Sequence, residues 1–152
     1  MDRVNAILAS SEYRNALEKI EARELDRIYC HHDIEHLLAV ARLMYIDVLE
    51  SGENIDRELV YAIALLHDIG RSVSDEDHEV QSANIAVHIM EICGYNAREI
   101  DMAREAILAH REGSQDTLGA LLYRADKMSR NCEYCKAKDS CKWLVKNKGV
   151  TR

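Results

Sequence analysis

The sequence predicts an all-α protein, a bundle of about six helices. Apolar residues recur at helical spacing through most of the chain, and no segment shows the strict alternation of a half-buried strand. The 152 residues include no Pro and only 6 Gly, too few turn-forming residues for a β-sandwich or barrel. With 47% apolar and 31% charged residues, the composition is that of a globular chain that can bury a core.

Start and stop signals place the individual helices. Ser10, Asp33 and Asp56 are N-cap candidates, while Gly52 and Gly70 are expected to end the second and third helices. Together with the periodicity, these signals predict helices at residues 10–29, 33–50, 56–70, 78–93, about 97–111 and about 117–130.

The last part of the chain has a different character. Residues 1–130 are expected to form the helical domain, and residues 131–152 a short basic extension with cysteines, weak periodicity and one short helix around residues 143–146. The formal net charge is −7, yet residues 124–152 carry nine Lys or Arg against three Asp or Glu. The acidic body argues against binding of duplex nucleic acid, whereas the basic tail could attract a phosphorylated small molecule or a partner.

Neither a membrane span nor a signal peptide is evident. No apolar run approaches the roughly 20 residues that cross a bilayer, and the first residues lack the basic-then-apolar pattern of a leader. We therefore expect a cytoplasmic protein without membrane association. Its five cysteines are then more typical of free thiols or a metal site than of disulfides. Glycine-rich phosphate-binding motifs are absent, which argues against kinase and Rossmann functions.

Polar residues interrupt the apolar faces of several expected helices. His36 lies in HLLAV, His67 and Asp68 end an apolar helix, His110 ends EAILAH, and Asp126 lies in LLYRADK. Each could be a satisfied core residue or a solvated helix end. Burying them separately is costly, but the cost falls if they meet around one cation, and imidazole with carboxylate suits a divalent transition metal.

These residues carry a family resemblance. The order His36, His67-Asp68, Asp126, in the contexts HLLAVAR, ALLHDIGR and LLYRADK, resembles the H…HD…D signature of the HD superfamily of metal-dependent phosphohydrolases. The resemblance covers about residues 30–130. It implies an HD-domain-like helical bundle in which these four residues are metal ligands.

Two further histidines resemble the additional ligands of HD enzymes that hold two metals, such as the HD-type diadenosine tetraphosphate hydrolases and the cyclic-dinucleotide phosphodiesterases. They are His78 in HEVQSANIA and His110 in AILAHR, although His78 could equally be a helix cap. Asp68 would then bridge one or two ions of Fe, Mn, Ni, Co or Zn. His32 could be a ligand, a supporting donor, a substrate contact or an exposed helix start. His31 and His88 are expected at the surface.

The resemblance implies hydrolysis of a phosphomonoester or phosphodiester, of nucleotide type, by metal-activated water. Asp68, Arg71 and Lys127 would be catalytic, and Arg71, Arg111 and Lys127 would bind the substrate, although each cation could also be an ordinary surface residue. Family members often carry Lys where Arg71 stands. HD proteins often form homodimers, but no feature here marks an interface. The alternative is a catalytically silent metal- and nucleotide-binding regulatory module with a partner-docking tail.

The tail carries three cysteines in the spacing C-x2-C-x5-C, namely Cys132, Cys135 and Cys141. Some HD proteins have a similar cysteine-and-tryptophan ending. Three thiolates could bind zinc or an iron–sulfur cluster, but a closed zinc site needs a fourth ligand, which Cys30 or Cys93 could supply. We favour reduced cysteines that pack within a small extension. A redox or partner-docking role is a further alternative.

Overall fold

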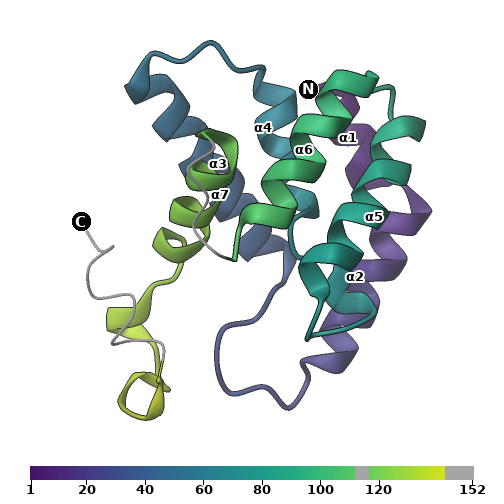
Figure 1. Ribbon diagram of the computed structural model, residues 1–152. Helices are drawn as coiled ribbons and strands as arrows, with labels where there is room; N and C mark the ends of the chain where they lie inside the picture. The colour runs from purple at the N-terminus through teal and green to yellow at the C-terminus, as the bar shows by residue number, and fades with distance from the viewer. Residues whose placement is uncertain (112–116, 143–152) are drawn as a thin grey trace.

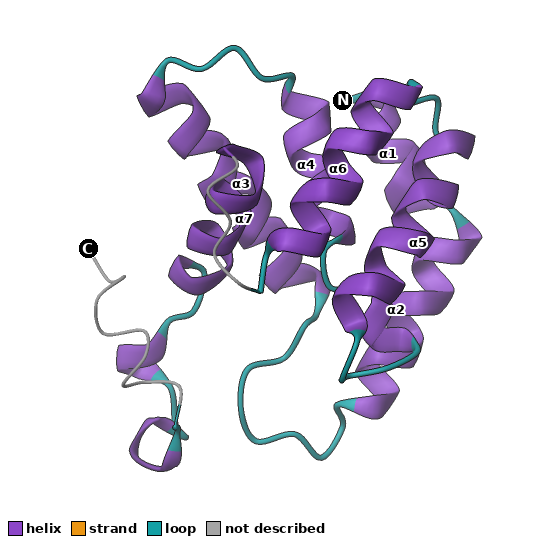
Figure 2. Ribbon diagram, viewed as in Figure 1, coloured by secondary structure: helices purple, strands orange, loops and turns teal. Residues whose placement is uncertain are grey.

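The computed structural model describes residues 1–111 and 117–142. Over these ranges the chain forms α-helices and short 3-10 helices, with no strand, so the predicted all-α class is confirmed (Figures 1 and 2). The α-helices are α1 (Asp2–Ala9), α2 (Ser11–Arg23), α3 (Ile34–Ser51), α4 (Arg57–Leu66), α5 (His78–Ile92), α6 (Ala97–Ala109) and α7 (Thr117–Met128). The 3-10 helices are η1 (Ile69–Ser72), η2 (Cys132–Tyr134) and η3 (Lys138–Ser140). No described helix has the length and apolarity of a membrane span.

Helix α4 is the centre of the bundle. It packs against α3, α6, α1 and α5, while α7 packs against α3 and α6, and α5 against α6 (Figure 1). Its sequence, RELVYAIALL, is apolar around most of its circumference, and every residue from Ala62 to Leu66 is fully buried. Because α4 ends in the middle of the molecule, the residues that follow it are delivered into the core.

Helix α1 was not predicted, since the first helix was expected to begin at residue 10. Val4 and Ile7 are buried, and Arg3 forms ion pairs with Glu58 at 2.9 Å and Glu99 at 2.9 Å. The Arg3 guanidinium also lies 4.2 Å from the centre of the Tyr95 ring. These contacts tie α1 to α4 and α6.

The first predicted helix was too long. Helix α2 ends at Arg23, and Leu25 and Ile28, assigned by periodicity to its apolar face, are 81% and 69% exposed. The Glu24 carboxylate instead accepts hydrogen bonds from the backbone N–H of His32, at 2.8 Å, and from its ring. Residues 24–33 therefore form the loop at the lower edge of Figure 1.

Gly70 does not end the third predicted helix. Helix α4 already stops at Leu66, and Gly70 lies in η1 without a positive φ angle, whereas Gly52, with φ 71°, ends α3 as expected. A Cβ atom at Gly70 would lie 2.3 Å from both the carbonyl oxygen of His78 and the backbone nitrogen of Ser82. The glycine is needed because the first turn of α5 crosses directly over it.

The last three helices lie where they were expected, with C-terminal ends one or two residues shorter. After α7 the described tail contains only the turns η2 and η3, in which no residue is buried. The short helix expected around residues 143–146 lies outside the described residues. The division into a domain of residues 1–130 and an extension of residues 131–152 stays a prediction.

Candidate metal centre

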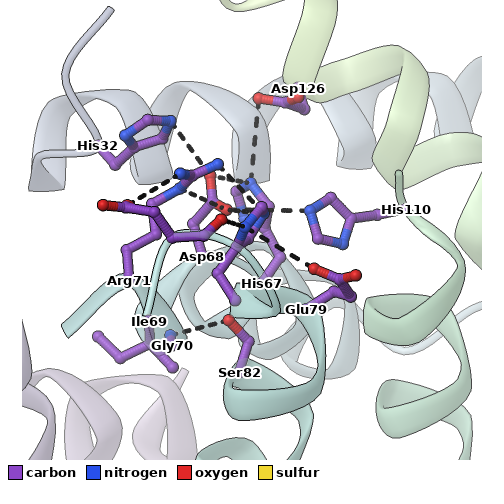
Figure 3. Close-up of polar contacts among 12 residues, drawn as sticks. His32, His67, Asp68, Ile69, Gly70, Arg71, Glu79, Ser82, His110 and Asp126 are labelled. Atoms are coloured by element: carbon purple, nitrogen blue, oxygen red, sulfur yellow. Dashed lines mark hydrogen bonds and ion pairs between the residues drawn. The ribbon is translucent and has the colours of Figure 1, made fainter. Parts of the chain in front are cut away.

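The six residues predicted as metal ligands converge from five segments of the chain. Figure 3 shows Asp68 and His67 at the centre, approached by His110 and Asp126 from different sides. All six are 8% exposed or less. They come from the first turn of α3, the end of α4, the first residue of α5, the end of α6, and α7: His36, His67, Asp68, His78, His110 and Asp126.

The two oxygens of Asp68 face different histidines. Oδ2 lies 3.2 Å from Nε2 of His67, while Oδ1 lies 3.2 Å from Nε2 of His78 and 3.8 Å from Nε2 of His110. Oδ1 of Asp126 lies 3.4 Å from Nε2 of His36. The ligand atoms form two groups, each within 4.8 Å, and Asp68 belongs to both: His36, His67, Asp68 and Asp126, and Asp68, His78 and His110.

The hydrogen bonds of Nδ1 set the orientation of the rings. In His67, His78 and His110, Nδ1 bonds to the backbone carbonyl three residues earlier, at 2.7 Å, 3.0 Å and 2.5 Å. In His36, Nδ1 bonds to Oγ of Ser129, whose hydroxyl donates to the Asp126 carbonyl. Since a carbonyl can only accept, the carbonyl-bonded Nδ1 atoms carry the protons. The Nε2 lone pairs then point at the carboxylates, as in metal-ligating histidines.

Nε2 of His67 shows that a cation fits here. This atom is fully buried and makes no hydrogen bond within the described part of the chain. Carboxylate oxygens of Asp68 and Asp126 lie 3.2 Å and 4.0 Å from it, and an ionised carboxylate cannot donate. Metal–ligand bonds of about 2.0–2.2 Å place neighbouring ligands roughly 3.0–3.5 Å apart, close to the distances between these atoms. The donor set suits a divalent transition metal.

Electrostatics keep two of the histidines neutral and make the centre as a whole attract positive charge. Burial lowers the pKa of His36 and of His110 to about 4, so both imidazoles are neutral near pH 7. Burial alone would raise the pKa of Asp68, but His67 and Arg71 outweigh it and hold that pKa well below its usual range. Burial opposes protonation of His67, yet the charge of Asp68 raises its pKa. The centre therefore attracts positive charge.

Of the three predicted substrate-binding cations, two contact the ligands directly. Arg71 donates from Nε to Asp68 at 3.0 Å and from Nη2 to Nε2 of His78 at 3.1 Å. Nζ of Lys127 lies 2.8 Å from Oδ2 of Asp126. Arg111 instead pairs with Glu79 at the rim, at 3.0 Å. All three cations line one cleft of about 670 Å³ beside the centre.

Sequence reasoning missed Arg130 and Glu24. Nη2 of Arg130 lies 3.1 Å from Nε2 of His36 and 3.3 Å from Oδ1 of Asp126. Its position four residues after Asp126 was a usable signal, because such residues share a helix face. Glu24 gave no comparable signal, since a carboxylate near the end of an amphipathic helix is ordinarily solvated.

His32 is not an exposed helix start, because α3 begins at Ile34 and His32 is 4% exposed. Its Nδ1 bonds to Glu24, and its Nε2 lies 3.6 Å from Oδ2 of Asp68. His31 and His88 are at the surface, as expected. Among the described residues, no three cysteine sulfurs lie within 4.8 Å of one another, so the structure does not bring the tail thiols to ligand spacing.

Comparisons with known proteins agree with this geometry. The sequence model of the HD domain matches residues 33–131, a range that contains all six converging residues. An uncharacterised protein of Clostridium beijerinckii is 40% identical over 146 residues, which cover 94% of this chain and 93% of that protein. No solved structure matches the chain. The resemblance in the sequence motifs is thus confirmed, and the chain belongs to the HD domain family.

Proposed function

We propose that this protein is a metal-dependent phosphohydrolase that cleaves a phosphomonoester or phosphodiester of a nucleotide-type small molecule. The observation that carries the proposal is the convergence of four imidazole Nε2 atoms on the carboxylates of Asp68 and Asp126, at the base of a cleft lined by cations. Membership of the HD domain family supports it, since that family is generally one of metal-dependent hydrolases.

The ligand set supports one or two ions, with Asp68 shared by the two groups. Iron or manganese fits this mixture of imidazole and carboxylate, and Ni, Co or Zn is also compatible. A metal bound here would lower the pKa of a water molecule and polarise a phosphoryl oxygen. The protein would orient the histidine ligands through the hydrogen bonds of their Nδ1 atoms. It would also supply cations that stabilise the negative charge developing on the phosphoryl oxygens.

The cleft supports a phosphorylated substrate. Its volume of about 670 Å³ is in the range of small-molecule sites. Arg71, Lys127 and Arg130 line it and could bind phosphate oxygens, with Arg as a bidentate donor. Tyr29 and Tyr123 line the same cleft and offer aromatic faces on which a base could stack. These two rings support the nucleotide-type substrate that the family resemblance implies.

Two measurements test the proposal. Metal content by inductively coupled plasma mass spectrometry should give one or two more equivalents of transition metal in wild type than in a His67→Ala/Asp68→Ala variant. The exposed His88 provides the matched control, because His88→Ala should keep the full complement. Metal-loaded protein is then assayed with p-nitrophenyl phosphate, bis-p-nitrophenyl phosphate and nucleotides. Turnover that depends on Asp68 supports the proposal, while an absence of bound metal after reconstitution with iron and manganese contradicts it.

Binding without turnover would favour the alternative, a regulatory module that binds metal and nucleotide. Equilibrium dialysis with nucleotides separates the two, because the module should bind nucleotide only when metal-loaded and leave it intact.

A cytoplasmic location is part of the same proposal, since all five cysteines are thiols in the structure. Whether two copies associate is tested by the mass of the metal-loaded protein in solution.

A further inference from the structure

Four of the five cysteines line one groove beside the metal centre, and His36 and Arg130 line the same groove. This groove, of about 530 Å³, lies between the loop of residues 24–33 and the tail, and its cysteines are Cys30, Cys132, Cys135 and Cys141. Cys30 is separated from the others by about a hundred residues of sequence. The fifth, Cys93, follows the end of α5 and does not line the groove. The structure therefore distinguishes between the two candidates for a fourth ligand that the sequence left open.

Hydrogen bonds attach the tail on both sides of Cys30. The hydroxyl of Tyr29 donates to the carbonyl of Ser140, the residue before Cys141, at 3.2 Å. Arg130, near the start of the tail, donates from Nη1 to the carbonyl of His31 at 3.0 Å. The residues on either side of Cys30 thus contact the two ends of the segment that contains the other three cysteines.

Apolar packing does not explain how this segment keeps its position. The turns η2 and η3 are three residues each and bury none of their residues, and Tyr134 is 85% exposed. So short a segment without a core of its own usually needs a disulfide or a metal to hold one structure. No disulfide is present, because all five cysteines are thiols.

We propose that Cys30, Cys132, Cys135 and Cys141 bind one zinc ion, at a site separate from the His and Asp centre. Four thiolates in tetrahedral array are a standard structural zinc site, and the spacing of two residues between Cys132 and Cys135 is typical of the ligands. The backbone N–H of Cys135 already donates to the carbonyl of Cys132, at 3.2 Å, which closes the turn between them.

Charge also supports zinc at this place. Binding of Zn²⁺ by four thiols releases four protons and leaves a net charge of −2 on the complex. Lys136 and Lys138 line the same groove and would offset that charge. An iron–sulfur cluster is the alternative occupant of such a site, because it is also bound by cysteine thiolates. The experiment below distinguishes it from zinc.

The site must close when zinc binds. Zinc–sulfur bonds of about 2.3 Å place the sulfurs about 3.8 Å apart, whereas no three of the described cysteine sulfurs lie within 4.8 Å of one another. Binding is therefore expected to draw the tail onto the loop, as metal binding couples to folding in small domains. Cys30 also lines the cleft of the metal centre, so this closure would fix one wall of that cleft.

Cobalt titration of the full-length reduced protein tests the site. Co²⁺ bound by thiolates gives an intense charge-transfer absorption in the near ultraviolet, which Co²⁺ bound by imidazole and carboxylate does not. We expect added Co²⁺ to produce this band with an intensity that saturates at one thiolate-bound equivalent, and Zn²⁺ to abolish it. Cys30→Ser and Cys135→Ser should lose the band, and Cys93→Ser, the matched control, should keep it. Circular dichroism of each variant checks that the helical domain is folded.

The outcomes separate this site from the metal centre. The band should persist in His67→Ala/Asp68→Ala protein, so failure of the proposed hydrolase would not remove it. Absence of the band in wild type overturns the proposal, as does Cys30→Ser protein with the same band as Cys93→Ser protein. An iron–sulfur chromophore in anaerobically isolated protein would show that the cysteines bind a cluster and would overturn the assignment of zinc. Protection of Lys136 and Lys138 from trypsin by Zn²⁺, lost in Cys30→Ser, would show that the tail closes on the loop.

Discussion

Replacement of Gly70 by alanine should both destabilise the fold and disturb the metal centre. The added Cβ would lie 2.3 Å from the carbonyl oxygen of His78 and 2.3 Å from the nitrogen of Ser82, and both contacts must open to about 3.0 Å. These are backbone atoms of α5, so no flexible side chain can move aside. The whole N-terminal turn of α5 must shift, and it carries His78, one of the residues that face Asp68.

The expected loss in the free energy of unfolding combines two effects. Overpacking of a well-packed interior typically costs about 1–3 kcal/mol. The hydrogen bond from the N–H of Gly70 to Oγ of Ser82, at 2.8 Å, would also be strained, and such a bond contributes about 1 kcal/mol. We therefore expect Gly70→Ala to lower the free energy of unfolding by about 2–4 kcal/mol, measured by urea unfolding of chelator-treated protein. In metal-loaded protein, the same variant should lack the ion that His78 would bind.

Gly52 provides a matched control for this experiment. It has φ 71° and nothing within 4 Å of an added Cβ, so Gly52→Ala should cost about 1–2 kcal/mol through backbone strain alone and leave metal content unchanged. Ser82→Ala isolates the hydrogen bond. If Gly70→Ala lost no more stability than Gly52→Ala and kept the full metal complement, close approach of α5 could not be the reason for glycine at this position.

Three further outcomes are expected. Asp68→Asn should lose every ion of the His and Asp centre, whereas His110→Ala should lose one at most, because only the carboxylate belongs to both ligand groups; equal metal content in the two variants would contradict a shared ligand. Hydrogen bonding to Arg3 lowers the pKa of Glu58 to about 2, so its stabilisation is present above pH 4.5 and is lost as the pH falls towards 2. Arg3→Ala should thus be less stable than wild type by about 1 kcal/mol near neutral pH. In urea unfolding, this difference in the free energy of unfolding should narrow as the pH falls from 4.5 towards 2 and should not change above pH 4.5. His32→Gln should lower phosphate ester hydrolysis about 10–100-fold at unchanged metal content, and loss of metal in this variant would instead make His32 a ligand.

The helices that were predictable from the sequence are those that local signals determine. Helix α4 combines a continuous apolar run with an Asp56 cap, and the side chain of Asp56 does accept from the N–H of Leu59. Helix α1 was missed because its main attachment, Arg3, bonds to residues 55 and 96 positions away in the chain. The end of α2 was misplaced for a similar reason, since Glu24 bonds to His32 across a loop.

More of the candidate site than of the surrounding structure could be predicted from the sequence. A histidine or carboxylate on an apolar helix face conflicts with burial unless a partner resolves it, and this conflict is visible in sequence at His36 and Asp126. The role of Gly70 was not visible, because a glycine after a helix fits a C-cap as well as it fits a close helix crossing. Only the position of α5 distinguishes the two.

The cations at the centre link metal binding to phosphate binding. Arg71 donates to Nε2 of His78, and Arg130 donates to Nε2 of His36, so each guanidinium engages a lone pair that a metal would need. Because arginine stays charged, both side chains must turn away when those lone pairs bind metal, and phosphate oxygens in the cleft are suitable new acceptors. Linked equilibria are reciprocal, so inorganic phosphate should tighten Mn²⁺ binding by the same factor by which Mn²⁺ tightens phosphate binding. Isothermal titration in both orders measures the two factors, and removal of the Arg130 guanidinium should reduce both together.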